Sequence, residues 1–352
     1  MNRIKGRGAA SNREGRFESV RREAVDDGWF PEHDENPARP ATTVTEERAR
    51  SIISRNASPD IPFDLSINPY RGCEHGCVYC YARPSHAYLN LSPGLDFETR
   101  LFAKRNAAER LREALARPGY RPSPINIGAN TDPYQPIERG YRITREVLEV
   151  LADARHPCTI ITKSAMVERD LDLLAGMARD GLVAVLVSVT SLDNRLSARL
   201  EPRASAPHRR IEAIRALAQA GVPVGVLVSP VIPMVTDVDL EEILARARAA
   251  GASQASYAVL RLPLEVADLF REWLEAHLPE RAAHVMSLVQ QMRGGRDNDP
   301  RFGVRMRGEG VFADLIARRF AVATRRLGYV AGEAYDLRCD LFRPPTPQGS
   351  LF

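Results

Sequence analysis

Three of the five cysteines in this chain of 352 residues lie within one short loop, at Cys73, Cys77 and Cys80. The spacing, C-x3-C-x2-C, allows a single loop to direct three sulfurs toward a common centre. Gly72 and Gly76 permit the positive-φ turns that such tight wrapping requires. Zinc sites and cubane iron–sulfur clusters normally take four protein ligands, and no fourth cysteine lies nearby. Three thiolates on a four-iron cluster would leave one iron open to a substrate or a cofactor.

Two other kinds of site use clustered cysteines. A tetrahedral zinc ion would need a fourth ligand, either a distant histidine or His75, which lies between two of the cysteines, where simultaneous bonding would be strained. A disulfide is disfavoured because three clustered cysteines cannot pair off, and long chains with few cysteines are typical of reducing compartments. We expect an iron–sulfur cluster, with zinc as the alternative.

The bulk composition is that of a globular protein without a targeting signal. Apolar residues make up 44% of the chain, and 49 basic against 45 acidic residues give a formal net charge of +4, too small to indicate a polyanionic partner by itself. No apolar stretch follows the N-terminal methionine, which predicts no secretory signal. The longest apolar segment, 222–235, is interrupted by prolines and is too short to span a bilayer. We expect a cytoplasmic protein with no membrane partner.

From residue 63 onward, apolar and β-branched runs alternate with helical patterns, which predicts parallel βαβ units. The expected strands are 63–68, 125–129, 158–162, 182–190, 222–231 and 255–260, and the expected helices are 97–116, 139–153, 167–179, 207–220 and 238–250. Six units are fewer than the eight of a full barrel. A doubly wound sheet is the alternative, but it would place a glycine-rich phosphate loop after the first strand, where this chain has its cysteine loop.

The chain is expected to divide into four segments. Residues 1–40 are highly charged with few apolar anchors, which predicts a disordered or draped N-terminal arm. Residues 41–262 would form the α/β core, with a short helix at 44–53. A helical extension over 263–330 would cover the open side of the core, and the proline-rich segment 331–352 reads as an extended tail. The helices expected in the extension are 264–277, 280–293 and 310–327.

The cysteine pattern, with Tyr79 just before the last cysteine, resembles the signature of the radical S-adenosylmethionine (SAM) enzymes. Residues 58–86, 131–136 and 162–164 resemble an uncharacterised bacterial radical SAM family that is grouped with spore photoproduct lyase, a DNA repair enzyme. The resemblance covers about residues 40 to 330. This chain departs from the lyase in one respect. The lyase uses a cysteine near its substrate to return a hydrogen atom, and this chain has no clear counterpart of that cysteine.

The resemblance implies a fold, two cofactors and a reaction. The fold is a partial (β/α)6 barrel of the TIM type, and the cofactors are a 4Fe-4S cluster on Cys73, Cys77 and Cys80 and SAM bound at its open iron. An external electron donor would reduce the cluster, which cleaves SAM to methionine and a 5′-deoxyadenosyl radical. That radical would abstract a hydrogen atom from the substrate.

The resemblance also implies residues that bind SAM. The backbone of Tyr79 would meet the adenine, and Asp132, after the second strand, would meet the ammonium group, although an ordinary Asp-Pro turn is an even competitor there. Arg203 would pair with the SAM carboxylate as a planar fork, unless Glu201 satisfies it without a ligand.

Hydroxyl groups along the fourth strand are further candidates. Ser188 and Thr190 occupy alternate positions and therefore point the same way, so Ser188 is expected to hydrogen-bond the ribose or carboxylate of SAM. Ordinary polar lining of the barrel is a strong alternative.

Two features bear on the substrate. Residues 293–326 hold nine arginines against four acidic residues, a stripe suited to phosphates, although a solvated helical face is the commoner origin of a charge run. The last five residues, Gln348–Phe352, resemble peptides that dock on the bacterial sliding clamp. We therefore expect a radical SAM enzyme related to DNA repair. The alternatives are a radical SAM enzyme that modifies a peptide or small molecule, and a non-catalytic iron–sulfur scaffold.

Overall fold

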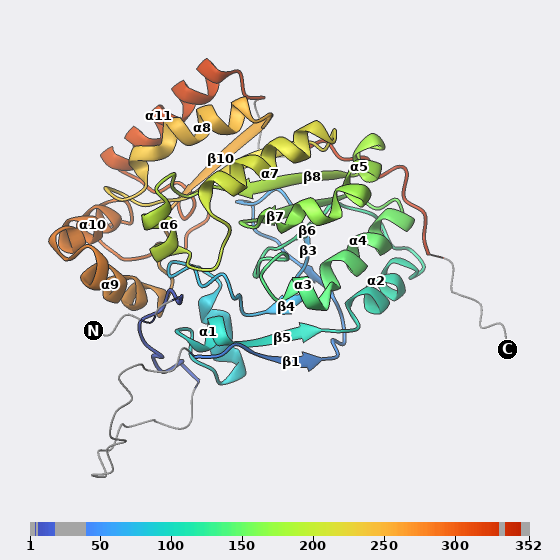
Figure 1. The fold of residues 1–352 in the computed structure, drawn as a ribbon, viewed down its shortest axis with the longest axis horizontal. Helices are drawn as coiled ribbons and strands as arrows, with labels where there is room; N and C mark the ends of the chain where they lie inside the picture. Colours follow the sequence, from blue (N-terminus) through green and yellow to red (C-terminus); the bar gives the residue numbers. More distant parts are fainter. Residues whose placement is uncertain (1–3, 5, 18–39, 331–334, 346–352) are drawn as a thin grey trace, which may run out of the picture.

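The computed structural model describes residues 4, 6–17, 40–330 and 335–345. Its main sheet has the strand order β10-β9-β8-β7-β6-β3-β2, in which neighbours from β3 to β10 run parallel and β2 is antiparallel (Figure 1). The strands are β2 Ile53–Arg55, β3 Leu65–Ile67, β6 Ile125–Ile127, β7 Cys158–Thr162, β8 Val183–Ser188, β9 Val224–Val231 and β10 Gln254–Val259. Each new parallel strand adds to the same side of the sheet, as in a barrel, without the reversal of order that marks a doubly wound fold.

The helices that follow the strands cover the outside of this curved sheet (Figure 1). They are α2 Ala107–Leu115, α4 Ile143–Asp153, α5 Leu171–Arg179, α7 Pro207–Gln219 and α8 Leu240–Ala249, with the short helices α3 Glu138–Tyr141, η2 Ala165–Asp170 and η3 Asp237–Asp239 beside them. Strand β8, Val-Ala-Val-Leu-Val-Ser, is buried along nearly its whole length, as expected of a parallel strand covered on both faces. The six parallel strands confirm the predicted partial (β/α)6 barrel.

One helix prediction near the N-terminal side of the barrel is wrong. Residues 44–53 contain no helix, and the chain instead forms strand β1, Thr43–Glu47, followed by β2. The β-branched run Thr43-Val44-Thr45 favours an extended backbone, and β1 finds a partner strand that sequence periodicity does not reveal.

The predicted helix 97–116 is also wrong in part. It is divided into α1 Asp96–Thr99, strand β5 Arg100–Lys104 and α2. Strand β5 pairs in parallel with β1 and antiparallel with β4, Tyr70–Arg71, and makes a second, three-stranded sheet. Leu101 and Ala103 are fully buried on one face of β5. These five residues therefore follow the two-residue period of a strand and not the 3.6-residue period of the predicted helix.

Two further short helices flank the cysteine loop. The first, η1 Arg83–Leu89, follows the loop directly. The second, α6 Asn194–Leu200, was not predicted, and the carboxylate of Asp193 caps it by accepting hydrogen bonds from the backbone N–H groups of its first turn.

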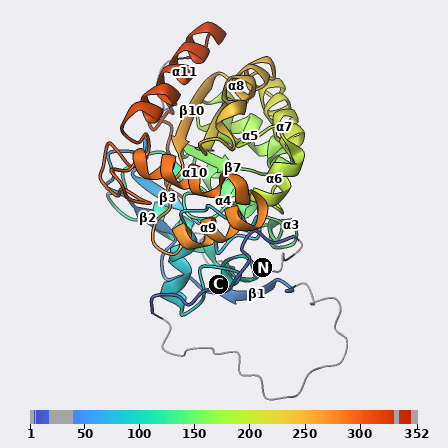
Figure 2. The ribbon, with the colours of Figure 1, turned by 90° about the vertical axis from the view of Figure 1, so that its left-hand side faces the viewer.

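The three C-terminal helices are confirmed as α9 Val266–His277, α10 Pro279–Gln291 and α11 Val311–Leu327. Helix α9 packs on the cysteine loop through Phe270 and Trp273, and α11 packs on α8 (Figure 2). Residues 335–345 run past the other end of the barrel, where the Arg343 N–H donates to the Ala154 carbonyl at 2.8 Å. The division into segments 1–40, 41–262, 263–330 and 331–352 stays a prediction.

The expectations about a membrane partner and a sliding clamp stay predictions. No helix among the described residues is long and apolar enough to cross a membrane. The clamp-like residues Gln348–Phe352 lie outside the described residues, so the expected clamp contact stays a prediction.

Candidate functional site

The cysteine loop follows β3 and β4 and lies at the carboxyl end of the parallel strands. Cys73 and Cys77 are each 7% exposed and Cys80 is half-buried. Gly72 and Gly76 have φ of +74° and +68°. A Cβ atom on Gly72 would lie 2.8 Å from the Phe97 carbonyl oxygen, so both the turn and the packing require glycine there. The predicted wrapping of the loop is confirmed.

A buried ion pair holds the loop in shape. The Arg83 guanidinium, fully buried, pairs with the equally buried Glu98 carboxylate. It also donates to the Cys77 carbonyl at 2.9 Å and to the Gly76 carbonyl at 3.2 Å. Two more carbonyls, those of Pro93 and Gly94, accept from the same side chain. Arg83 therefore fixes the backbone between two of the cysteines from inside the protein.

Residues 6–13, which we call the N-terminal strap, cross the outer side of the loop. The backbone N–H groups of Gly8 and Ala9 donate to the Glu98 carboxylate at 3.0 and 2.8 Å. Farther along, Ser11 and Arg13 both bind Glu272 of helix α9, at 2.7 and 2.6 Å. The strap thus ties the cysteine loop to the C-terminal helices and screens it from solvent.

Gly8 sets how closely the strap approaches the loop. A Cβ atom at Gly8 would lie 1.8 Å from the Gly76 carbonyl oxygen, so Gly8→Ala must displace the strap. We expect a loss of about 1–3 kcal/mol in the free energy of unfolding and faster loss of bound iron to a chelator. Gly140→Ala is the matched control, because a Cβ there meets nothing within 4 Å. Equal iron-release rates for the two variants would contradict a sealing role for the strap.

Asp132 lies beside the loop, but protein groups already occupy its carboxylate. Its oxygens accept from Thr162 Oγ1 at 2.7 Å and from the backbone N–H groups of Lys163 and Tyr134 at 2.7 and 2.9 Å. The carboxylate also lies 3.2 Å from His75 Nδ1. Burial favours neutral forms, yet this ion pair raises the pKa of His75 to about 10 and lowers the pKa of Asp132. The geometry favours positioning of His75, and a contact with SAM stays a prediction.

A polar cluster lies beneath the loop at the carboxyl ends of β7 to β9. Lys163 Nζ contacts Ser188 Oγ at 2.5 Å, the Ser229 carbonyl at 3.1 Å and Glu201 Oε1 at 3.4 Å. Thr190 Oγ1 donates to the same carboxylate at 2.7 Å. Ser188 and Thr190 therefore face one centre, as predicted from their alternation, and that centre is the lysine.

Tyr79 and Arg210 complete this polar cluster. The Tyr79 hydroxyl donates to the Glu201 carboxylate, and Arg210, 1% exposed, pairs with its other oxygen. Burial alone would raise the pKa of Glu201, but Arg210 and Lys163 hold it below its ordinary value. The sequence assigned no role to Lys163 or Arg210, and only the position of Lys163 at the end of a predicted strand signalled it.

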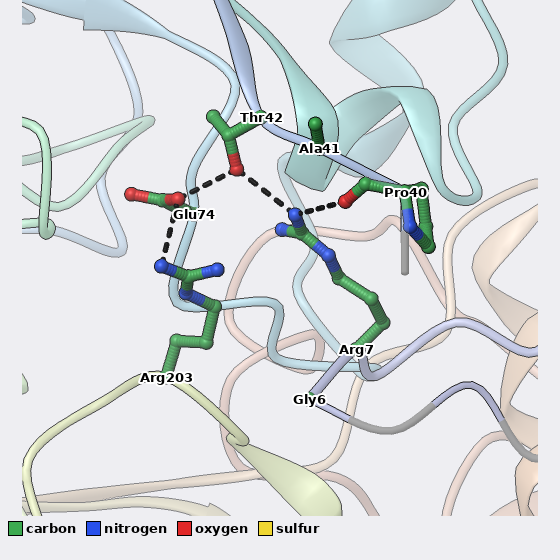
Figure 3. Close-up of a pocket in the computed structure, with 7 residues that line it drawn as sticks. All are labelled: Gly6, Arg7, Pro40, Ala41, Thr42, Glu74 and Arg203. Atoms are coloured by element: carbon green, nitrogen blue, oxygen red, sulfur yellow. Dashed lines mark hydrogen bonds and ion pairs between the residues drawn. The ribbon is translucent and has the colours of Figure 1, made fainter. Parts of the chain in front are cut away.

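Arg203 lies on the outer side of the loop, away from this cluster. Its guanidinium pairs with Glu74 Oε1 at 3.0 Å, and its backbone N–H donates to the His75 carbonyl at 3.2 Å. The alternative without a ligand, in which Glu201 pairs with Arg203, is wrong, because the buried Arg210 takes that carboxylate. Arg203 instead borders a surface hollow of about 450 Å³ (Figure 3). Its other lining residues are Gly6, Arg7, Pro40, Ala41, Thr42 and Glu74.

The donor set of the loop fits an iron–sulfur cluster. Burial raises the pKa of Cys77 well above its ordinary value and that of Cys80 to about 11, and the neighbouring cysteines add to both shifts. Such thiols become thiolates only beside a strong cation, which a metal cluster supplies. No three potential ligands among the described residues converge on a single metal ion. A four-iron cube binds its thiolates through separate iron atoms, so its ligands need no such convergence.

Comparison with known sequences identifies relatives of this chain. A family model described as the radical SAM superfamily matches residues 67–247. An uncharacterised protein of Mycobacterium tuberculosis is 37% identical over 233 residues, which cover 66% of this chain and 68% of the relative. An uncharacterised protein of Methanocaldococcus jannaschii is 27% identical over 214 residues, covering 61% and 76%.

Comparison with solved structures gives the same fold. Spore photoproduct lyase complexed with dinucleoside spore photoproduct aligns with a TM-score of 0.58 and 16% identity, over 81% of this chain and 80% of the lyase. A variant of the lyase with bound AdoMet and the same photoproduct aligns with a TM-score of 0.50 and 16% identity, over 81% and 78%.

Proposed function

The chain belongs to the radical SAM superfamily, whose cofactors are a 4Fe-4S cluster and SAM, and we propose that Cys73, Cys77 and Cys80 are the cluster ligands. The observation that supports this most directly is the gathering of three thiols, two buried and one half-buried, on one clamped loop at the carboxyl end of a barrel. Catalytic residues of such barrels lie at that end. When bound, the cluster supplies one electron to SAM, whose cleavage yields the radical that removes hydrogen from the substrate.

Residues of the polar cluster are suited to hold the SAM carboxylate. Lys163 and Arg210 bring two positive charges against the single carboxylate of Glu201, which leaves one positive charge to be balanced by an anion. Arg210 is sealed in the interior, whereas the Lys163 side chain is 16% exposed. We propose Lys163 as the carboxylate partner and Ser188 as the group that orients it. Tyr79 and Asp132 keep their predicted roles toward adenine and ammonium, and Arg203 remains an alternative for the carboxylate.

We propose a nucleic acid as the substrate class, in line with the predicted link to DNA repair. The ring of Tyr81, the residue after Cys80, is 50% exposed and lies 5.4 Å from the Arg261 guanidinium. The exposed Phe302 ring similarly lies 4.6 Å from Arg305. Interleaved cations and exposed aromatic rings are what nucleic-acid phosphates and unstacked bases require. We call these four residues the mouth patch.

Of the two arginines in the mouth patch, Arg261 is the one whose guanidinium is available to bind a ligand. Its Nε has no hydrogen-bond partner among the described residues, and its only acceptor there is the sulfur of Met306 at 3.4 Å. Burial and the nearby Arg305 lower the pKa of Arg261. A phosphate beside this guanidinium would stabilise its charged form against both effects. Arg305 is less available, because Asp60 already pairs with it.

The predicted basic stripe contributes less than its charge suggests. Arg293 is buried and donates to backbone carbonyls, including that of Leu260 at 2.7 Å. Arg301 pairs with Asp299 at 2.6 Å and Arg319 with Glu241 at 2.7 Å. Much of the stripe therefore stabilises the C-terminal segment, and the exposed arginines are spread over separate elements.

Arg261→Gln tests the substrate class. We expect the affinity for single-stranded DNA to fall roughly tenfold at low salt and the slope of log affinity against log salt to decrease by about one. Arg215→Gln, an exposed arginine on α7 with no ion pair among the described residues, is the matched control. Fluorescence anisotropy measures both. Wild-type protein that binds no DNA at low salt would favour a peptide or small-molecule substrate instead.

Anaerobic reconstitution tests the proposed chemistry itself. The purified chain is loaded with iron and sulfide, reduced with dithionite and supplied with SAM, and 5′-deoxyadenosine is measured by chromatography. We expect steady formation of 5′-deoxyadenosine that depends on both the iron and the reductant. A reduced four-iron protein that never cleaves SAM would support the scaffold alternative.

A further inference from the structure

Helix α6 presents a row of arginines next to the cysteine loop. Arg195 and Arg199 are exposed and four residues apart, so they share one face of the helix. The exposed Arg203 follows three residues after the helix ends at Leu200. Among the described residues, neither Arg195 nor Arg199 forms an ion pair. The two guanidinium groups therefore add positive charge to this side of the cysteine loop without a carboxylate to balance it.

Arg7 of the N-terminal strap extends this row across the surface hollow. Its guanidinium donates to the Pro40 carbonyl at 2.7 Å and to Thr42 Oγ1 at 2.9 Å (Figure 3). Thr42 in turn donates to Glu74, the same carboxylate that pairs with Arg203. Burial and the neighbouring Arg203 both lower the pKa of Arg7.

The charges of this face do not cancel. Four guanidinium groups, on Arg7, Arg195, Arg199 and Arg203, stand against two carboxylates, those of Asp193 and Glu74, which leaves about two positive charges. Glu201, the remaining acid of this stretch, is buried against Arg210. We call these four arginines the arginine face.

The segment that carries Arg195, Arg199 and Arg203 is hydrogen-bonded directly to the backbone of the cysteine loop. The Leu200 carbonyl at the end of α6 accepts from the Val78 N–H at 3.0 Å, and the Arg203 N–H donates to the His75 carbonyl at 3.2 Å. Both bonds end on residues between Cys73 and Cys80. None of the residues that line the hollow belongs to the six parallel strands. An electron can therefore reach the loop from this face without passing through the barrel interior.

We propose that the arginine face is the docking surface for the electron donor, an acidic protein that carries a flavin or an iron–sulfur group. This rests on the proposed function, because it requires the cluster on the cysteine loop. In the step served by the surface, one electron leaves the reduced carrier, which is oxidised by one electron. The cluster is reduced by that electron, and no proton or atom is transferred. Positive charge on the face raises the encounter rate with an acidic partner.

The test compares two reductants on the reconstituted full-length protein. Photoreduced flavodoxin, an acidic flavin protein, is mixed with oxidised protein in a stopped-flow instrument, and bleaching of the cluster absorbance gives the second-order rate constant. Dithionite, a small reductant that needs no docking surface, is used in parallel. Arg195→Gln/Arg199→Gln removes the two unpaired charges, and Arg195→Gln alone serves as a second, milder variant. The control is Arg112→Gln/Arg117→Gln, an exposed arginine on α2 and an exposed arginine two residues beyond the end of that helix.

At low ionic strength we expect the double variant to be reduced by flavodoxin about tenfold more slowly than wild type. Its rate should also depend less steeply on salt, while dithionite reduction and iron content stay unchanged. Rates within twofold of the control, with the salt dependence intact, would overturn the proposal. Weakened DNA binding with an unchanged flavodoxin rate would do the same and would assign the face to nucleic acid. A wild-type protein that dithionite also fails to reduce would remove the proposed function and the docking surface with it.

Discussion

Replacing Cys77 by alanine is expected to abolish 5′-deoxyadenosine formation and to lower the iron retained per chain to near background. The reason is that two thiolates remain where three are required, and no other cysteine in the described residues lies on the loop. Cys339→Ala is the matched control, since that thiol lies in the half-buried tail away from the barrel mouth and should keep full activity. Iron content and 5′-deoxyadenosine are measured on the same preparations.

Loss of folding does not explain this effect, because Cys77 contributes little to stability. Its side chain packs among apolar groups that include Leu200, Ile232 and Trp273, and truncation of one sulfur in such a core costs about 1 kcal/mol. Thermal unfolding of the cluster-free variant should therefore stay close to that of the cluster-free wild type. A Cys77→Ala protein that folds, retains four irons and still cleaves SAM would refute the ligand assignment.

Replacing Arg83 by methionine is expected to lower the free energy of unfolding by about 3–5 kcal/mol, because it leaves the Glu98 carboxylate buried without its partner. The change also removes the donors to the Gly76 and Cys77 carbonyls, so the loop should hold iron less tightly as well. Urea unfolding of the cluster-free protein measures the first effect, and chelator competition measures the second.

The double variant Arg83→Met/Glu98→Gln separates the two contributions of Arg83. Neutralising the stranded carboxylate should recover part of the lost stability, since the buried charge is then gone, while the freed loop carbonyls should keep iron binding weak. A single Arg83→Met variant that loses less than about 1 kcal/mol would show that the ion pair does not support the loop.

The barrel was predictable because each of its parallel strands can be recognised from its own local sequence. Strand β8 is a nearly continuous apolar run that contains three valines, as expected of a parallel strand covered on both faces. In the helices after the strands, apolar residues recur with the 3.6-residue period of a helix. The second sheet was not predictable in this way. Strand β5 follows α1 without a break. Its extended conformation depends on pairing with β1 and β4, which lie far away in the sequence.

The site was predictable only where its residues are close in sequence. The spacing of Cys73, Cys77 and Cys80 identifies the loop by itself, and alternation along the predicted strand 182–190 places Ser188 and Thr190 on one side. The partners of these residues come from distant positions: Glu98 for Arg83, and Arg210 for Glu201. A charged residue in a sequence does not reveal which opposite charge it meets inside the fold. That is also why Asp132 looked available to a ligand when protein groups hold it.

The most direct test of the central claim is low-temperature electron paramagnetic resonance of the anaerobically reconstituted, reduced protein, recorded before and after addition of SAM. We expect the signal of a reduced 4Fe-4S cluster whose g values change when SAM is added, because SAM binds the one iron that has no protein ligand. A protein that holds zinc, or a four-iron signal that SAM leaves unchanged, would contradict the account.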